Sequence, residues 1–343
     1  METKVIRITS APLSEQLVLP GQIIASGGLV VFPTETVYGL GGNALNPASS
    51  KKIYAAKGRP SDNPLIVHVA RPEDAEELAF TVPSFYELAQ AFMPGPLTVI
   101  LKKKDTVPSE TSGGLDTVAI RCPANPVAHA LIECAGVPIA APSANLSGKP
   151  SPTSAQDVLE DMSGRVDCII DGGPSDIGLE STIVSLAGDV PVLLRPGGIT
   201  YDALLCVLPG LEIAHAVTHE IGIHEKALSP GMKYRHYAPS KPLILLKGPE
   251  EKILSFLKQK QLSEKCAILC YSEELSQLNG ERLYDIGRGS DLETQAHRLF
   301  SSIRMADRSD AAVIYAHLPI LDGLGLALYN RLIRAAAHTV IEL

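Results

Sequence analysis

Short apolar runs alternate with helical patterns along the first 210 residues of the chain. The runs are rich in β-branched residues and are bounded by Gly, Pro or polar clusters, which is typical of buried strands. The pattern predicts strands at 29–32, 65–69, 97–101, 118–121, 138–141, 168–171, 181–185 and 192–195. Strands that alternate with helices predict an α/β fold, here an open, twisted, mixed sheet with covering helices.

One helix carries clear signals at both of its ends. Asn46 can cap the first turn, and Pro47 suits the first helical position. Gly58 can adopt the left-handed conformation that closes a helix. The signals predict that the helix ends at Lys57, so that Lys57 and Arg59 project from its C-terminal end.

The periodic pattern is lost between about 211 and 240 and then resumes. A long segment without periodicity inside a compact protein is usually a linker or an active-site lid. Beyond it, strands are predicted at 243–246, 267–271, 282–286 and 312–315, and helices at 250–261, 292–307 and 326–337. We therefore predict a catalytic domain at 1–210, a linker or lid at 211–240, and a smaller Rossmann-like α/β domain at 241–343.

The composition of the whole chain favours an enzyme with two domains. Its 343 residues exceed what one hydrophobic core usually serves, and the 45% that are hydrophobic supply enough apolar surface for two cores. Aromatic residues make up only 5%, and there is no Trp. This fits a soluble α/β enzyme better than an RNA-stacking or carbohydrate-binding surface.

The formal net charge of −8 arises in residues 1–210, which hold 14 Lys and Arg against 22 Asp and Glu. Such an acidic balance disfavours broad affinity for nucleic acids. Within this acidic half, Lys51, Lys52, Lys57 and Arg59 form a local basic cluster. The cluster could hold a polyphosphate, or it could be a solvated helix face.

The six cysteines are scattered without a C-x-x-C pair, so reduced and buried thiols are expected. No apolar stretch approaches the ~20 residues needed to span a bilayer. No signal-type apolar core follows the first residues. We therefore expect a cytoplasmic protein without a membrane segment.

A turn rich in hydroxyls and glycines, PTETVYGLGG at 33–42, follows the first predicted strand and lacks a Walker lysine. Because its leading proline should keep the segment extended, Thr34, Thr36 and Tyr38 are expected on one face, where they suit a polar ligand. Side chains bonded to the neighbouring backbone are the alternative. The glycines match the dinucleotide pattern G-x-G-x-x-A, but their distances from the strand and the next helix are wrong for it.

The basic pair Lys57 and Arg59 admits two interpretations. The two cations could merely complement the negative end of the helix dipole. However, the sequence SDNP that follows leads directly into the strand at 65–69. This would tether the pair at a sheet edge, where α/β enzymes place their ligands, so contact with phosphate is the favoured interpretation.

Other predicted strands begin or end in polar residues. Arg121 closes one strand with a fork-shaped donor that suits a carboxylate, and a structural ion pair is the competing account. Ser143 and Asn145 follow another strand in APSANLSG, where small residues allow close backbone approach but no G-x-S-x-G nucleophile elbow is present. Ser181 opens one strand and Arg195 ends the next, and each is ambiguous alone.

Two later segments offer weaker signals. Ser151 and Thr153 flank a proline that could start a helix with a phosphate-binding N-terminus, and helix capping is the alternative for either hydroxyl. His219 and His224 stand in an H-E-x-x-x-H spacing, one residue too long for the paired ligands of H-E-x-x-H. A dedicated metal site is therefore not predicted.

Several segments, read in order along the chain, carry a family resemblance: PTETVYGLG, KGRPSDNPL, PGPLT, GLDTVAIRCP, APSANLSG, SPT, ESTIV, LLRPG and SPGMKYRHYAP. Together they resemble the YrdC family of threonylcarbamoyl-AMP synthases in its longer, two-domain form. The resemblance covers nearly the whole chain and is densest from about 29 to 200. The last hundred residues match only loosely.

The resemblance implies that L-threonine, bicarbonate or CO2, and ATP give threonylcarbamoyl-adenylate and pyrophosphate. Mg²⁺ would be the cofactor, held mainly by the ATP phosphates. The product would serve threonylcarbamoyladenosine formation in tRNA through a separate transferase partner, without strong direct binding of tRNA. The main rival is a non-catalytic RNA-binding or ribosome-associated module, and a generic amino-acid adenylating enzyme is a third hypothesis.

The resemblance also implies which residues would form the site. The motif residues expected to carry catalysis are Lys57, Arg59, Ser143 and Asn145. Those expected around ATP are the same four with Ser61, Thr117, Ser151, Arg195 and, as a lid on the linker, Tyr237. Those expected around threonine are Thr34, His68, Arg121, Ala141 through its backbone, and Ser181, with Arg121 on the threonine carboxylate.

Overall fold

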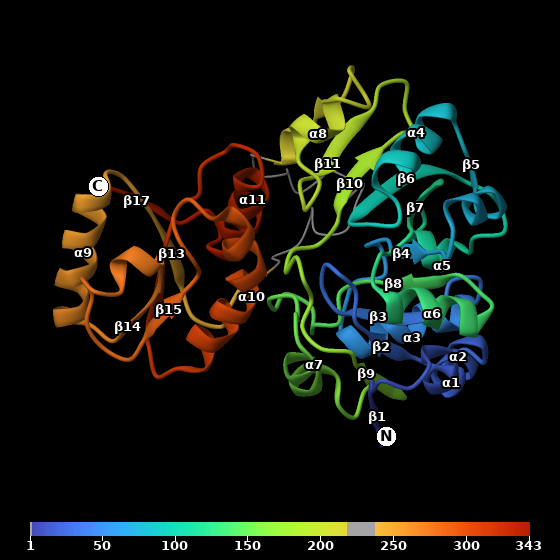
Figure 1. Ribbon diagram of the computed structural model, residues 1–343, viewed down its shortest axis with the longest axis horizontal. Helices are drawn as coiled ribbons and strands as arrows, with labels where there is room; N and C mark the ends of the chain where they lie inside the picture. The colour runs from blue at the N-terminus through green and yellow to red at the C-terminus, as the bar shows by residue number, and fades with distance from the viewer. Residues whose placement is uncertain (1, 218–236) are drawn as a thin grey trace. The chain divides into compact units, whose positions relative to one another are not determined.

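The computed structural model describes residues 2–217 and 237–343 (Figure 1). The chain divides into two compact units. The first comprises Met1–Ser147, Pro152–Asp176 and Glu180–Lys233. The second comprises Gly148–Ser151, Ile177–Leu179 and Tyr234–Leu343, so it takes in two short segments from the first half of the chain.

The described part of the first unit is built on one 12-stranded mixed sheet. Its strands run in the order β1-β9-β2-β3-β8-β4-β7-β6-β10-β11-β12, and β5 pairs with β6. Their bounds are β1 (Lys4–Arg7), β2 (Val30–Phe32), β3 (Gly39–Asn43), β4 (Ile66–His68), β5 (Ala79–Phe80), β6 (Leu97–Lys103), β7 (Thr117–Arg121), β8 (Ile139–Ala141), β9 (Cys168–Asp171), β10 (Thr182–Ser185), β11 (Val192–Arg195) and β12 (Glu212–Ile213). The predicted α/β class with an open mixed sheet is confirmed, and each strand predicted here is present.

Strand β3 lies where the sequence indicates a glycine-rich turn, and packing explains the difference. The strand pairs antiparallel with β2, which places Phe32 opposite Gly39. A Cβ atom on Gly41 would lie 2.8 Å from the Phe32 ring and 2.8 Å from Ile139 Cγ2. Glycine is therefore required where the aromatic ring crosses this strand, although glycine has a low intrinsic preference for strands.

The helices of the first unit are α1 (Leu13–Gln16), α2 (Val18–Ala25), α3 (Pro47–Lys57), α4 (Pro83–Phe92), α5 (Ser109–Ser112), α6 (Pro126–Ala135), α7 (Ala155–Met162) and α8 (Tyr201–Leu205), with 3₁₀ turns η1 (Pro72–Glu77) and η2 (His215–Val217). Helix α3 confirms its sequence signals. Asn46 Oδ1 accepts a hydrogen bond from Ala48 N at 2.9 Å, and Gly58 closes the helix with a φ of 61°. Lys57 is the last helical residue, as predicted.

Helices cover both faces of the large sheet. Along β2, Val31 belongs to one apolar cluster, whereas Val30 and Phe32 belong to another, as the two-residue period of a strand requires. Helices α3, α4 and α7 contribute to the first cluster, and α2 and α6 contribute to the second. The central strands are therefore buried on both faces.

The second unit contains a 5-stranded sheet in the order β15-β14-β16-β13-β17, with every pairing parallel. Helix α9 lies on one side of it, and α10 and α11 lie on the other (Figure 1). The bounds are β13 (Leu243–Lys247), α9 (Glu250–Ser263), β14 (Cys266–Cys270), η3 (Ser272–Glu274), β15 (Leu283–Asp285), α10 (Leu292–Arg308), β16 (Val313–His317), α11 (Gly325–Ala335) and β17 (Val340–Glu342). This confirms a smaller α/β domain with parallel strands. None of the helices in the described ranges is both long enough and apolar enough to cross a bilayer.

Candidate functional site

The segment between β2 and β3 is bent, which corrects the prediction of an extended run. It bends at residues 35–37. Thr34 Oγ1 donates to Val37 O at 2.6 Å and lies 2.8 Å from Thr36 Oγ1, whereas the hydroxyl of Tyr38 donates to Gly173 O at 2.5 Å. The three hydroxyls therefore do not share one face. Thr34 and Thr36 meet because the backbone turns back on itself, and Tyr38 bonds elsewhere.

The K-x-R and S-x-N motifs meet in the structure although more than eighty residues separate them. The side chain of Lys57 is buried, and its ammonium donates to the backbone oxygens of Ser143 and Asn145, the latter at 2.6 Å. Ser143 Oγ in turn donates to Asn145 Oδ1 at 2.5 Å. The lysine thus fixes the loop after β8 and sets the position of both polar side chains.

The same loop is joined to the turn after β2. Leu40 N donates to Pro142 O at 2.9 Å, and Ala144 N donates to Tyr38 O at 2.8 Å. Ala141 ends β8 directly before these bonds, and a Cβ on Gly39 would contact the Ala141 side chain at 3.5 Å. Ala141 and Ser143 are therefore held against the segment that carries Thr34.

The other residues predicted near the phosphates occupy the approach to β4 and the start of β7. Arg59 Nη2 lies 3.4 Å from Asn63 O and 3.3 Å from Pro64 O, so the guanidinium braces the turn before β4. Ser61 is exposed in this turn. Thr117 begins β7, so about 13 Å of strand separates it from Arg121 at the other end.

Arg121 forms a buried ion pair, the competing account that the sequence left open. Its Nη2 lies 2.7 Å from Glu35 Oε1, and the two side chains are only 4% and 8% exposed. Glu35 Oε2 accepts a hydrogen bond from Asn125 N at 3.3 Å. Burial alone would raise the pKa of Glu35, but the charge and hydrogen bond of Arg121 outweigh burial and hold this pKa below its ordinary value.

At least one donor of the Arg121 guanidinium lacks a partner among the described residues. Its Nε is buried and has no hydrogen-bond partner in the part of the chain that the structure describes. A buried donor without a partner costs free energy, which an acceptor supplied by a ligand would restore. Glu35 was not identified from the sequence; its only signal was its place between Thr34 and Thr36 in a hydroxyl-rich segment.

His68 lies beside Arg121 in the sheet and is held neutral. The β4–β7 register pairs the two residues directly. Burial, and then the positive charge of Arg121, lower the pKa of His68 to about 3. Its Nδ1 lies 3.1 Å from Ile66 O, and its ring packs edge-on against Phe32. The imidazole can therefore offer a hydrogen bond or a packing surface to a ligand, but no positive charge near neutral pH.

Ser181 and Arg195, which were assigned to different substrates, bond directly to each other. Arg195 Nη2 donates to Ser181 Oγ at 3.1 Å, and Arg195 Nε donates to Ser181 O at 3.0 Å. Ser181 Oγ also lies 2.7 Å from Thr98 Oγ1. The antiparallel pairing of β10 with β11 brings the serine and the arginine together. Thr98 was missed because it lies inside a predicted apolar strand.

The remaining predicted residues belong to the second unit or fall outside the described ranges. Ser151 and Tyr237 are both in the second unit, where the Tyr237 ring lies 5.4 Å from that of Phe300. Their predicted roles at ATP and as a lid stay predictions. Most of the SPGMKYRHYAP segment, together with His219 and His224, lies in 218–236 and is not described. Within the described ranges, no grouping of His, Cys, Asp and Glu is suited to a metal ion.

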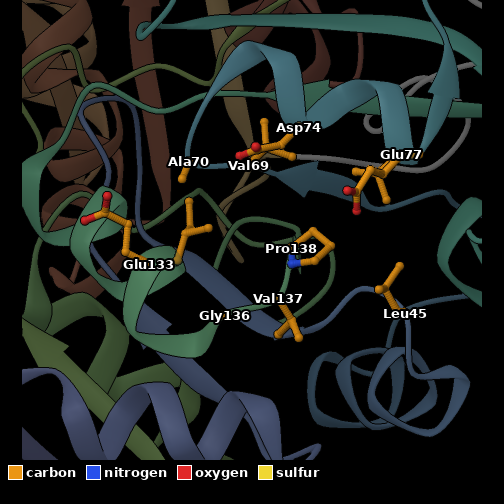
Figure 2. Close-up of a pocket in the computed structure, with 11 residues that line it drawn as sticks. Leu45, Val69, Ala70, Asp74, Glu77, Glu133, Gly136, Val137 and Pro138 are labelled. Carbon is orange, nitrogen blue, oxygen red and sulfur yellow. The ribbon is translucent and has the colours of Figure 1, made fainter.

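Two cavities are described, and neither is lined by a predicted site residue. One, of about 270 Å³, lies in the first unit and combines apolar side chains with the carboxyl groups of Asp74, Glu77 and Glu133 (Figure 2). Arg71 engages Asp74 at 3.0 Å. The other cavity lies in the second unit. Some of the predicted residues are instead joined in local groups: Lys57 with Ser143 and Asn145, His68 beside Arg121, and Ser181 with Arg195.

A mixed sheet covered by helices, bearing the joined K-x-R and S-x-N motifs and followed by a smaller parallel-sheet domain, defines a two-domain protein of the YrdC type. A family model described as Telomere recombination matches residues 22–197. A second, described as Threonylcarbamoyl-AMP synthase, C-terminal domain, matches residues 199–337. The chain therefore belongs to the two-domain family of threonylcarbamoyl-AMP synthases.

Individual relatives agree over nearly the whole length. The chain is 45% identical over 330 residues to the threonylcarbamoyl-AMP synthase of Bacillus subtilis (strain 168), covering 95% of this chain and 94% of the relative. It is 46% identical over 326 residues to that of Pyrococcus abyssi (strain GE5 / Orsay), covering 93% of each. A crystal structure of P. abyssi Sua5 complexed with L-threonine is similar with a TM-score of 0.91 and 43% identity over 100% of both chains.

Proposed function

We propose that the protein is an L-threonylcarbamoyladenylate synthase, a nucleotidyltransferase that converts L-threonine, bicarbonate or CO2, and ATP into threonylcarbamoyl-AMP and pyrophosphate. The observation that carries the proposal is the meeting of Lys57 with Ser143 and Asn145 in a protein of this family. The bond network holds polar donors and a cation at one place on the sheet. The relatives named above support the same activity.

The reaction needs positioning and charge neutralisation more than a reactive side chain. The neutral amine of threonine adds to CO2, and the resulting carbamate oxygen attacks the α-phosphorus while pyrophosphate leaves. No covalent bond to the protein forms. Correct placement of two reactants can supply up to about 7–11 kcal/mol of the barrier. Fixed donors and cations that face the phosphates supply a further part.

Lys57, Arg59 and Arg195 are the cations proposed for the nucleotide, with the hydroxyls of Ser143 and Thr117 beside them. ATP would enter as its Mg²⁺ complex, so that the metal is carried by the phosphates. The residues present fit a metal ion that is carried by the phosphates, because the polar groups proposed around ATP are hydroxyls, amides and cations. The carboxylate of Glu35 is already paired with Arg121. The metal ion would offset phosphate charge during attack.

Threonine is proposed to lie beside Arg121. The unpartnered Nε of Arg121 is the donor available to its carboxylate. The buried hydroxyls of Thr34 and Ser181 and the backbone of Ala141 would contact the rest of the molecule. His68, being neutral, would contribute packing or a hydrogen bond. The P. abyssi structure complexed with L-threonine supports a site for this amino acid.

The product is proposed to pass to a separate transferase that modifies tRNA. Such a division of labour suits an acidic protein, because the net charge of −8 opposes tight binding of tRNA to this chain itself. The carbamate and its adenylate are labile in water, so the transfer should follow synthesis closely.

The decisive test is pyrophosphate release from the purified full-length protein, with each substrate omitted in turn from degassed buffer. We expect release only when L-threonine, bicarbonate and MgATP are all present, and a product with the mass of threonylcarbamoyl-AMP. Release with threonine and ATP alone would identify a generic amino-acid adenylating enzyme. Failure to release pyrophosphate under any combination would favour the non-catalytic RNA-binding module.

A further inference from the structure

The second unit contains a cavity of about 260 Å³ that the proposed reaction does not use. The residues that line it are Gly248, Glu250, Ile253, Tyr271, Glu273, Gly289 and His317. Three of them follow or end neighbouring parallel strands, namely β13, β14 and β16. The chain leaves β14 toward β15 but leaves β16 toward β17, in the opposite direction. The cavity thus lies at a topological switch point, where open parallel sheets bind ligands.

A buried carboxylate orients the histidine on the wall of this cavity. Glu274 is fully buried, and its Oε1 lies 2.8 Å from His317 Nε2. Its other oxygen accepts a hydrogen bond from Tyr271 N at 2.8 Å. The Tyr271 ring stacks on the imidazole with 4.4 Å between centroids. The imidazole is therefore held in one orientation, with Nε2 engaged by the carboxylate and Nδ1 on the other side of the ring.

The second ring nitrogen of His317 points to a ligand. His317 is only 8% exposed and lines the cavity, yet Nδ1 has no hydrogen-bond partner within the described ranges. Because Nδ1 is not among the fully buried atoms that lack a partner, it is accessible to a molecule in the cavity. A carboxylate that fixes one nitrogen while the other faces a cavity is the arrangement by which proteins present an imidazole to a bound group.

The lining also supplies two carboxylates. Glu250 begins α9, and its side chain has no hydrogen bond or ion pair to any residue that the structure describes. Glu273 Oε2 accepts a hydrogen bond from Gly289 N at 3.3 Å, which leaves its other oxygen available. Gln295 Nε2 fixes the same glycine by donating to Gly289 O at 3.1 Å. The loop at Gly289 is therefore braced on this border of the cavity, whereas Glu250 is exposed.

The lining selects for a ligand that donates hydrogen bonds and carries positive charge. Its formal charge comes from Glu250 and Glu273, and the lining set contains neither Lys nor Arg. Burial, and then the charges of Glu274 and Glu273, raise the pKa of Tyr271 to about 12, so its hydroxyl stays neutral. A bound metal ion is a poor alternative, since the described side chains offer no suitable ligand grouping.

We propose that this cavity is a binding site for a small organic molecule of roughly amino-acid size that carries a protonated primary amine. The ammonium would donate to His317 Nδ1 and to the carboxylates of Glu250 and Glu273. A primary ammonium has three donors, and the lining offers His317 Nδ1 and the carboxylates of Glu250 and Glu273 as acceptors. The site is independent of the proposed synthase chemistry, because no residue assigned to that chemistry lines it.

The test uses two probes of equal size that differ in charge. Full-length protein labelled with ¹³C at histidine Cε1 is titrated with ethanolamine and, separately, with ethylene glycol, in the absence of threonine and ATP. The signal of His317 is assigned by its loss in His317→Asn. We expect a saturable shift of this signal with ethanolamine and none with ethylene glycol. A response to both probes alike, or a shift that does not saturate, overturns the proposal.

Two matched variants at the start of α9 complete the test. Glu250→Gln removes one proposed acceptor charge, whereas Glu251→Gln changes the adjacent exposed glutamate, which does not line the cavity. We expect the dissociation constant for ethanolamine to rise about tenfold or more in Glu250→Gln and to stay unchanged in Glu251→Gln. Equal affinity in the two variants overturns the proposal. Pyrophosphate release should be unchanged in both, which separates this site from the synthase site.

Discussion

Replacing Glu35 by Gln tests whether the buried ion pair with Arg121 organises the threonine side of the site. The variant keeps the shape of the side chain but removes the charge opposite a guanidinium that is only 4% exposed. Breaking a buried pair by removing one partner costs about 3–5 kcal/mol, because the other charge is left uncompensated. Gln can still accept from Asn125 N, so we expect a loss of about 3 kcal/mol in the free energy of unfolding.

The measurement is urea unfolding of the full-length protein followed by far-UV circular dichroism, since the chain has no Trp to serve as a fluorescent probe. A double-mutant cycle of Glu35→Gln, Arg121→Met and the double variant isolates the interaction energy of the pair. We expect the double variant to recover most of the stability that Glu35→Gln loses. The surface partner Glu110, which pairs with Lys51, provides a control, and Glu110→Gln should have little effect because solvent screens that pair.

The same pair predicts a pH dependence with a definite sign. The pKa of Glu35 in the folded protein lies below its ordinary value of 4.5. Its contribution to stability is therefore fully present above about pH 4.5 and is lost as the pH falls through the folded pKa. The difference in the free energy of unfolding between wild type and Glu35→Gln should become smaller in that acidic range. A loss below about 1 kcal/mol at neutral pH, or additive effects in the cycle, would refute the reasoning.

Three further predictions concern the candidate site. Lys57→Met should lower pyrophosphate release about 10²-fold, because the donors on the loop after β8 lose the ammonium that anchors them. Lys51→Met, on the exposed side of the same helix, should leave the rate unchanged, and equal rates in the two variants would contradict the role of Lys57. Ser181→Ala should raise the KM for L-threonine about tenfold in the same assay, and an unchanged KM would remove Ser181 from the threonine site. The ring signals of His68 should not titrate in NMR spectra between about pH 5 and 8, since its pKa is lowered to about 3; a midpoint near 6.5 would contradict its burial beside Arg121.

Local patterns predicted the elements well because their causes are local. Helix α3 has its cap, first-turn proline and closing glycine within one short stretch of sequence. The apolar runs became strands because alternate residues of a buried strand must pack on both faces, as Val30 and Val31 do. Strand β3 was missed because its glycines are required by the Phe32 ring from a neighbouring strand, and a partner across the sheet leaves no mark in the local pattern.

The site was predicted as a set of residues but not as a set of bonds. The ion pair of Arg121 with Glu35 joins residues 86 positions apart, and the bond between Ser181 and Arg195 joins residues on two consecutive strands. A strand-terminal arginine is compatible with a ligand or with a carboxylate from the same chain, and only the fold decides between them. The extended alternation after Phe32 failed because Thr34 bonds to its own turn.

The allocation of Gly148–Ser151 and Ile177–Leu179 to the second unit bears on any attempt to express the halves separately. Arg304 Nη2 donates to Pro150 O at 2.6 Å, and a Cβ on Gly178 would lie 2.5 Å from Ala296 O. A protein truncated before Tyr234 would lack the residues that contact these two segments. Cutting the chain at this boundary would therefore remove the contacts that hold the segment leading into Ser151, a residue predicted to contact ATP.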